Sequence, residues 1–392
     1  MAREVWITGI GLTSSLGEGL DAHWRALAGS EPVAPVLDTA FTPPFAIHPM
    51  VALELDTQIP KKSDQRQMEP WQRLGTYTAG LALADAGVAG NLDILANTHV
   101  IVAADTGILA GMPAAADPDA FLNQHLATDL RPTLFLAQLP NLMAGNISIV
   151  HKATGSSRTF MGEEIAGASA LEVVWRRAAA GQGDIFLVGG ACAADRKDTI
   201  LNDVLGGVLW QGEHRGIWDR AAAGGGAILG SASAFLVVEA REHAEARGAR
   251  PYARIAEVLT DQSRRRPGDV SQKLTRQFEA IAPAGKPPVS VLSGATGIEP
   301  ATAEERDVLA SLIAAGRVDT VRAPGTLIGA AMSATFPALA GLAALAIARR
   351  GFYRPNDATG FETPAAATPE RVAITSVGVW RGEASALFVP AG

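Results

Sequence analysis

Short apolar runs recur along the chain and are bounded by glycine, aspartate or other polar residues. They are rich in β-branched side chains, which is the pattern of buried strands. Because both alternate faces are apolar, such runs indicate a sheet covered on its two sides. The predicted strands are Val5–Ile10, Val100–Ala104, Ile185–Val188, Phe235–Val238, Val289–Leu292 and Val372–Val377.

Helical periodicity fills the intervals between these runs. Apolar side chains at Leu74, Tyr77, Leu81 and Val88 share one helical face, and Gly87 is placed to end that helix. Two further helices rich in small residues are predicted at residues 166–180 and 336–349. Alternating strands and helices predict an α/β fold built in layers.

Composition and charge exclude several classes of protein. The 392 residues carry a formal net charge of −7, which disfavours a nucleic-acid binder driven by phosphate neutralisation. No uninterrupted apolar run reaches 18 residues, so no membrane span is predicted. The first residues lead directly into a strand and lack the features of a signal peptide, so we expect a cytoplasmic protein.

Few residues offer chemistry of their own. The single cysteine, Cys192, excludes an internal disulfide; it follows an apolar run and is interpreted as a packed residue. The seven histidines show no metal-ligand spacing, and Gly9-Ile10-Gly11 lacks the third glycine of a dinucleotide fingerprint. We therefore expect neither a metal nor a cofactor. The basic run Arg264–Arg266 is interpreted as a solvated loop, with a docking spot for an acidic partner as the alternative.

Several segments, in order along the chain, resemble the β-ketoacyl-ACP synthase family of the thiolase fold. They cover nearly the whole chain: residues 5–17, residues 141–149, Arg215-Gly-Ile-Trp-Asp-Arg220, residues 229–239 and residues 243–249. The resemblance implies an α/β, thiolase-like fold of two duplicated halves in αβαβα layers. We expect the halves to span residues 1–250 and 251–392. The proline-rich stretch Pro283–Pro288 is another place where one half could end.

The resemblance also implies where the catalytic groups of an active member would stand. Its nucleophilic cysteine lies at a helix start, three residues before a glycine that matches Gly167, and this places Glu164 at that position. A carboxylate is comfortable at a helix N-terminus but cannot carry an acyl thioester. The ordinary interpretation of Glu163 and Glu164, as acids in a first helical turn, fits the same physics.

Four more positions depart from the pattern of an active member. The two catalytic histidines are matched by Gly294 and Thr326, and the catalytic lysine by Val321. The phenylalanine of the C-terminal gating loop is matched by Val379. Inactive homologues of this kind, called chain-length factors, usually carry glutamine where this chain has Glu164.

The resemblance therefore implies a non-catalytic subunit that pairs with an active β-ketoacyl-ACP synthase and works with an acyl carrier protein. Substrate-tunnel residues are expected near the family's dimer interface, at Ile108, Gly111 and Met112. One alternative is a homodimeric homologue whose chemistry is rebuilt around Glu164, as a decarboxylase or hydrolase. Another is an acyl-binding protein. The product class, whether polyketide, polyene or very-long-chain fatty acyl, is left open.

Overall fold

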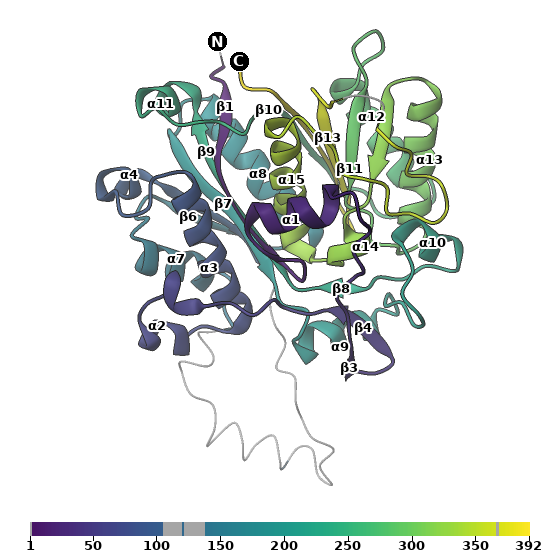
Figure 1. Cartoon of the computed structure of the whole chain (residues 1–392), viewed down its shortest axis with the longest axis horizontal. Helices are drawn as coiled ribbons and strands as arrows, with labels where there is room; N and C mark the ends of the chain where they lie inside the picture. The colour runs from purple at the N-terminus through teal and green to yellow at the C-terminus, as the bar shows by residue number, and fades with distance from the viewer. Residues whose placement is uncertain (1, 105–119, 121–137, 366–367) are drawn as a thin grey trace.

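The computed structural model describes residues 2–104, 120, 138–365 and 368–392, and Figure 1 shows their arrangement. The first part of the chain contains β1 (Val5–Ser14), β2 (Gly17–Glu18), α1 (Gly19–Ala28), β3 (Asp38–Thr42), β4 (Phe45–His48), a 3-10 turn η1 (Leu55–Thr57), α2 (Lys62–Arg66), α3 (Pro70–Asp85), α4 (Leu92–Asn97), β5 (His99–Ala103), α7 (Leu142–His151), β6 (Ser157–Phe160), α8 (Glu164–Ala179), β7 (Ile185–Cys192), α9 (Lys197–Leu205), α10 (Ile217–Ala222), β8 (Leu229–Gly230), β9 (Ala232–Ala240) and α11 (Arg241–Ala246).

The second part contains β10 (Ala253–Asp261), α12 (Asp269–Ile281), β11 (Val289–Ser293), α13 (Ala301–Ala314), β12 (Val318–Arg322), α14 (Gly325–Ile328), a 3-10 turn η2 (Met332–Ala334), α15 (Thr335–Ala348), β13 (Val372–Val377) and β14 (Glu383–Val389).

Eleven of the described strands form one mixed sheet in the order β12-β11-β13-β14-β10-β1-β9-β7-β5-β6, with β2 paired to β1. The strands on the two sides of the β1–β10 junction repeat the same pattern. β9 runs antiparallel to both of its neighbours, β1 and β7, and β5 and β6 then run parallel to β7. β10, β14, β13, β11 and β12 repeat these directions in the same order. The fold is therefore internally duplicated.

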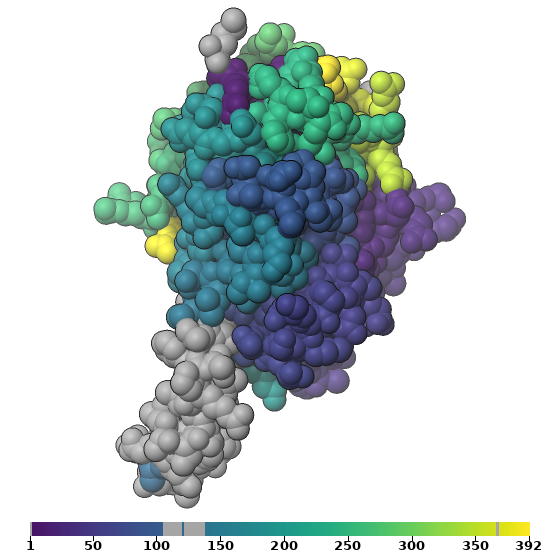
Figure 2. Space-filling view, turned by 90° about the vertical axis from the view of Figure 1, so that its left-hand side faces the viewer, coloured from purple at the N-terminus to yellow at the C-terminus, as the bar shows by residue number. Residues whose placement is uncertain are grey.

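Helices form three layers around the two parts of the sheet. α3 and α7 cover the outer face of the first part, and α12 and α13 cover the outer face of the second (Figure 1). α8 and α15 pack between the two parts and lie in one core with β1, β9, β10 and β14. This is the αβαβα arrangement that the family resemblance implied. Figure 2 looks at the side of the molecule that is formed mostly by the blue and teal segments of the first part.

The inner helix α15 needs small residues because it packs closely against the strands and α8 at the centre of the fold. Twelve of its fourteen residues are buried, because sheet strands and α8 surround it. A Cβ atom added at Gly341 would lie 3.0 Å from a methyl of Ile10, so glycine lets α15 approach β1. Pro337 lies in the first turn, where its missing N–H removes no intrahelical hydrogen bond.

Each predicted strand and helix is present, with bounds shifted by a few residues. The predicted helix around Leu74 is α3, and the helices predicted at residues 166–180 and 336–349 are α8 and α15. Pro283–Pro288 joins α12 to β11 inside the second repeat, so it is not a boundary between halves. The boundary at residue 250 stays a prediction. Within the described ranges no helix is long and apolar enough to cross a bilayer. The predicted cytoplasmic location stays untested.

Candidate functional site

Glu164 is the first residue of α8, directly after a sharp turn that leaves β6. The turn places Gly162 and Glu163 at positive φ, +133° and +61°, and so reverses the chain into the helix. Glu164 is buried, with 4% of its surface exposed. Its carboxylate belongs to the first turn of α8, where the helix dipole favours negative charge.

The C-terminal loop, residues 378–382 between β13 and β14, lies directly against Glu164. The backbone N–H of Val379 donates to the Glu164 carboxylate with a nitrogen–oxygen distance of 3.4 Å. A Cβ atom at Gly378 would lie 3.3 Å from the same carboxylate oxygen. Two positions that are 215 residues apart, Glu164 and Val379, therefore meet at one site.

An ion pair between Arg265 and Glu383 stabilises this loop. The Arg265 guanidinium donates to the carbonyl oxygens of Gly378 and Gly382, at 3.0 and 2.9 Å, and to the Ser263 hydroxyl at 2.7 Å. It also pairs with the Glu383 carboxylate, whose side chain is fully buried. Arg265 is mostly buried, so the interpretation of Arg264–Arg266 as a solvated loop is wrong at this residue. The burial of Arg265 follows from its ion pair with Glu383, which is too distant in the sequence to be inferred from the local pattern.

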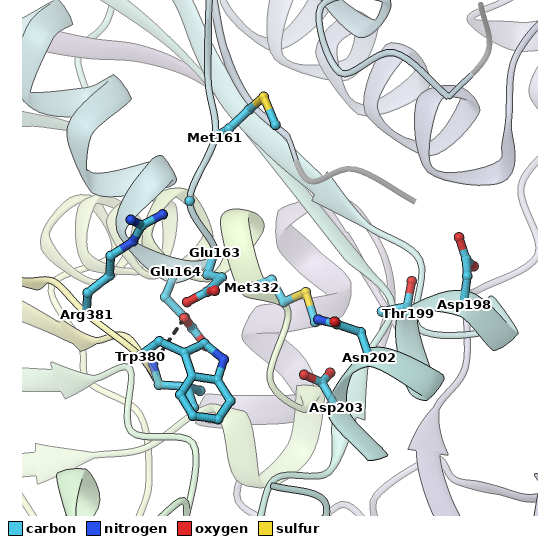
Figure 3. Close-up of a pocket in the computed structure, with 12 residues that line it drawn as sticks. Met161, Glu163, Glu164, Asp198, Thr199, Asn202, Asp203, Met332, Trp380 and Arg381 are labelled. Atoms are coloured by element: carbon cyan, nitrogen blue, oxygen red, sulfur yellow. Dashed lines mark hydrogen bonds between the residues drawn. The ribbon is translucent and has the colours of Figure 1, made fainter. Parts of the chain in front are cut away.

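The carboxylates near the start of α8 line a pocket of about 310 Å³. Figure 3 shows Glu163 and Glu164 on one side of this pocket, with the side chains of α9 facing it from the other. Arg381 is the one cation among the described residues that line it. The other lining residues are Met161, Gly162, Asp198, Thr199, Asn202, Asp203, Met332, Val379 and Trp380.

Two of the α9 acids were not predicted from the sequence. Asp203 is buried at the pocket wall, and Asp198 forms an ion pair with Arg196 at 2.5 Å. Their spacing of five residues on a short helix gives no motif that would separate them from ordinary surface acids. The pocket is thus predominantly acidic, and this character comes from α9 as much as from the α8 start.

Gly294 lies at the end of β11, away from the acidic pocket. Its N–H donates to the Thr375 carbonyl oxygen at 2.9 Å. A Cβ atom built there would meet that same oxygen at 2.6 Å and a methyl of Leu339 at 3.2 Å. Because backbone occupies the space, an imidazole could not stand at this position without displacing β13.

Thr326 and Val321 also point to places other than the pocket. The hydroxyl of Thr326 accepts the backbone N–H of Ile217 at 3.2 Å, at the start of α10. Its carbonyl oxygen lies 3.1 Å from Nε2 of His214. Val321, on β12, is fully buried in the outer core with α12 and α13. Of the five candidate positions, the structure places Glu164 and Val379 together and separates the other three from the acidic pocket's lining.

Cys192 ends β7 and is buried among Ala232, Ala331 and Ala334. Within the described part of the chain, no cluster of three or more His, Cys, Asp or Glu side chains is arranged to hold a metal ion. The predicted tunnel residues Ile108, Gly111 and Met112 lie outside the described residues, and their role stays a prediction.

Comparison with known proteins gives the family. Residues 2–244 match the model of the β-ketoacyl synthase N-terminal domain. The 3-oxoacyl-[acyl-carrier-protein] synthase 2 of Rhizobium meliloti (strain 1021) is 28% identical over 269 residues, which are 64% of this chain and 63% of that protein. The match thus spans less than two thirds of that relative's own length.

Two solved structures share the fold at low sequence identity. The ishigamide ketosynthase/chain length factor superposes with a TM-score of 0.79 at 20% identity, over 100% of both chains. A type II PKS acyl-carrier protein in complex with its ketosynthase bound to the hexaketide gives a TM-score of 0.74 at 15% identity, again over 100% of both. The family match, together with the duplicated αβαβα fold, shows that this chain belongs to the β-ketoacyl synthase family.

Proposed function

We propose that this chain is a non-catalytic, chain-length-factor-type subunit that pairs with an active β-ketoacyl-ACP synthase during acyl-chain elongation. The observation that carries the proposal is Glu164 at the first position of α8, where the resemblance implies a nucleophilic cysteine. A carboxylate there is held by the helix start and by the Val379 N–H, and it cannot form the acyl thioester that condensation requires.

The surroundings of the other candidate positions support the same proposal. Gly294 has no room for a histidine side chain, and the Thr326 hydroxyl accepts a hydrogen bond from the backbone N–H at the start of α10. General acid–base catalysis needs a titratable group within hydrogen-bond reach of the reacting atoms. Neither position supplies one, so the loss of chemistry extends beyond the nucleophile.

The proposed partners are an active synthase subunit and an acyl carrier protein. Support comes from the two structural relatives, one a ketosynthase/chain length factor and the other a ketosynthase with its acyl-carrier protein. In the proposed complex, this subunit helps to set product length by shaping the acyl tunnel, with Ile108, Gly111 and Met112 as the expected wall.

Co-expression tests the proposal. The chain would be produced with an intact β-ketoacyl-ACP synthase of the same organism, purified through a tag on this chain alone, and supplied with malonyl- and acyl-loaded carrier protein. We expect a 1:1 complex on size exclusion that condenses, and no condensation by this chain alone. A stable monomer that binds no synthase would contradict the proposal.

Chemistry rebuilt around Glu164 is the second candidate, and the acidic pocket is the observation that favours it. The Glu164 carboxylate lines a space of about 310 Å³, large enough for a small acyl group or for water. Hydrolysis of acyl thioesters, or decarboxylation of malonyl carrier protein, by the purified chain would support this function. The activity would then fall at least a hundredfold in Glu164→Gln, which keeps the shape and removes the charge.

A further inference from the structure

The two ends of the described sheet differ in how they are covered. At one end, β12 is largely buried, because the Thr320 hydroxyl and the Arg322 guanidinium bond to the carbonyl oxygens of Thr363 and Tyr353, each at 2.7 Å. At the other end, β6 pairs with β5 alone among the described strands. Ser157 and Arg158 on this strand are exposed. The described residues therefore leave β6 as an open edge, which is a template for pairing with another chain.

Apolar side chains flank this edge. Ile149, on α7 next to β6, is 60% exposed, and Met161, immediately after β6, is 56% exposed. Both belong to the first part of the chain, whose segments form most of the face shown in Figure 2. A partner that adds a strand to this edge would pair with the free backbone groups and bury the apolar side chains beside them.

Symmetry restricts what happens if the partner is a second copy. Two β6 strands joined edge to edge in one sheet run antiparallel about a twofold axis normal to the sheet. Such an axis keeps every side chain on the same face as its symmetry mate. Arg158 and its mate would then stand about 5 Å apart if the pairing centres on Arg158, or about 8 Å apart diagonally if it centres on Thr159.

Both spacings place like charges within the screening length of physiological salt, about 8 Å. A second arginine strengthens the effect, since Arg177 of α8 interacts electrostatically with Arg158. Burial, and then the Arg158 charge, hold the Arg177 pKa below its ordinary value. A self-pair would gather four guanidinium groups, and among the described residues no carboxylate forms an ion pair with Arg158.

We infer that Arg158 is a partner-selecting residue, which disfavours edge-to-edge pairing of this chain with itself and favours a different chain that carries an aspartate or glutamate on the facing strand. The inference rests on the proposed pairing with an active synthase, and it specifies that the partner's facing strand carries an acidic side chain. An acidic residue opposite Arg158 replaces repulsion between like charges with a cross-strand ion pair.

The test needs only this chain and its charge reversal. Sedimentation equilibrium would be run at 50 mM and 500 mM NaCl on the wild type, on Arg158→Glu, and on their equimolar mixture. The mixture contains pairs in which arginine faces glutamate. We expect it to associate about tenfold more tightly than either protein alone at low salt, with most of the gain lost at high salt. A mixture that associates no more tightly than the wild type alone would overturn the inference.

Arg276→Glu is the matched control, because Arg276 is exposed on α12, in the outer layer of the second repeat. Its mixture with the wild type should behave as the wild type does. The measurement is independent of condensation. If the Arg158 mixture pairs but no synthase binds the chain, the proposed function fails and the edge chemistry stands. If a synthase binds and the mixture shows no gain, the reverse holds.

Discussion

The charge of Glu164 is stabilised by interactions that any carboxylate at the start of a helix can make, without a catalytic role. The helix dipole, the Val379 N–H and the closed loop at residues 378–382 all accommodate its charge. In the proposed non-catalytic subunit the absence of a histidine at Gly294 has a steric basis as well, because β13 fills the space that its side chain would need.

Restoring the nucleophile alone should therefore fail to restore the reaction. We predict that Glu164→Cys reacts with iodoacetamide, since the side chain faces the pocket, yet shows no condensation of malonyl carrier protein above that of the wild type. Intact mass and a radiolabelled condensation assay measure the two properties. Condensation within tenfold of an active synthase would show that the histidine positions are dispensable.

Cys192 provides the complementary test. It is buried in a small alanine-lined cluster and is not among the described residues that line the acidic pocket, although Met332 borders both. We predict that Cys192→Ser leaves the rate of the synthase complex nearly unchanged. A loss of a hundredfold, about 2.7 kcal/mol in barrier, in a folded complex would mean that the nucleophile had been misplaced.

Some site residues could be predicted from the sequence, and others could not because their burial depends on contacts with distant residues. Glu164 can be placed at a helix start through the family resemblance, which is anchored on the glycine three residues later. The buried state of Arg265 could not be inferred, since a basic triplet is usually solvated and its partner Glu383 lies 118 residues away. Asp203 carries no local signal, because nothing in the sequence around it separates a buried acid on a short helix from an exposed one.

Among the elements, the loop between β13 and β14 depends on one ion pair. Glu383 is fully buried, so removal of Arg265 leaves a carboxylate without its cation in the interior. We predict that Arg265→Ala lowers the free energy of unfolding by about 3–5 kcal/mol, measured by urea denaturation. Arg264→Ala, an exposed neighbour, should change it by less than about 0.5 kcal/mol.

The double variant Arg265→Ala with Glu383→Gln separates the charge from the packing. It should recover part of the lost stability, because the buried charge is removed with its partner. A loss in Arg265→Ala no larger than that in Arg264→Ala would show that the loop is held by other contacts.

The contact between α1 and β1 makes stability depend on pH. His23 is buried and bonds to the Ser14 hydroxyl at 2.8 Å and the Gly19 carbonyl at 2.7 Å. Burial lowers its pKa from 6.5 to about 4. The folded protein thus takes up this proton less readily than the unfolded chain, so the contribution is complete above pH 6.5 and is lost as the pH falls towards 4.

We predict that this histidine alone accounts for about 3 kcal/mol of lost stability across that window. His23→Gln should be less stable than the wild type at pH 7, yet lose less on acidification. Urea midpoints at pH 7, 6 and 5 measure the difference. Parallel curves for the two proteins would contradict the assignment.

For the whole molecule, the alternation of apolar runs and helical periodicities was enough to predict a layered α/β fold. The duplicated halves came from the family resemblance, and the repeated strand directions agree with it. The strands β6, β10, β12 and β14 were not predicted. β6 is a four-residue edge strand and β10 carries partly buried charged residues, so neither shows a continuous apolar run. Their places are set by pairing with distant strands, which no local pattern records.

The central claim is that this chain takes part in elongation without carrying the acyl group itself. The most direct measurement is the intact mass of each subunit in the reconstituted complex after brief exposure to acyl-loaded carrier protein. We predict an acyl adduct on the partner synthase and none on this chain. A stoichiometric acyl adduct on this chain, formed and discharged at the rate of turnover, would contradict the account.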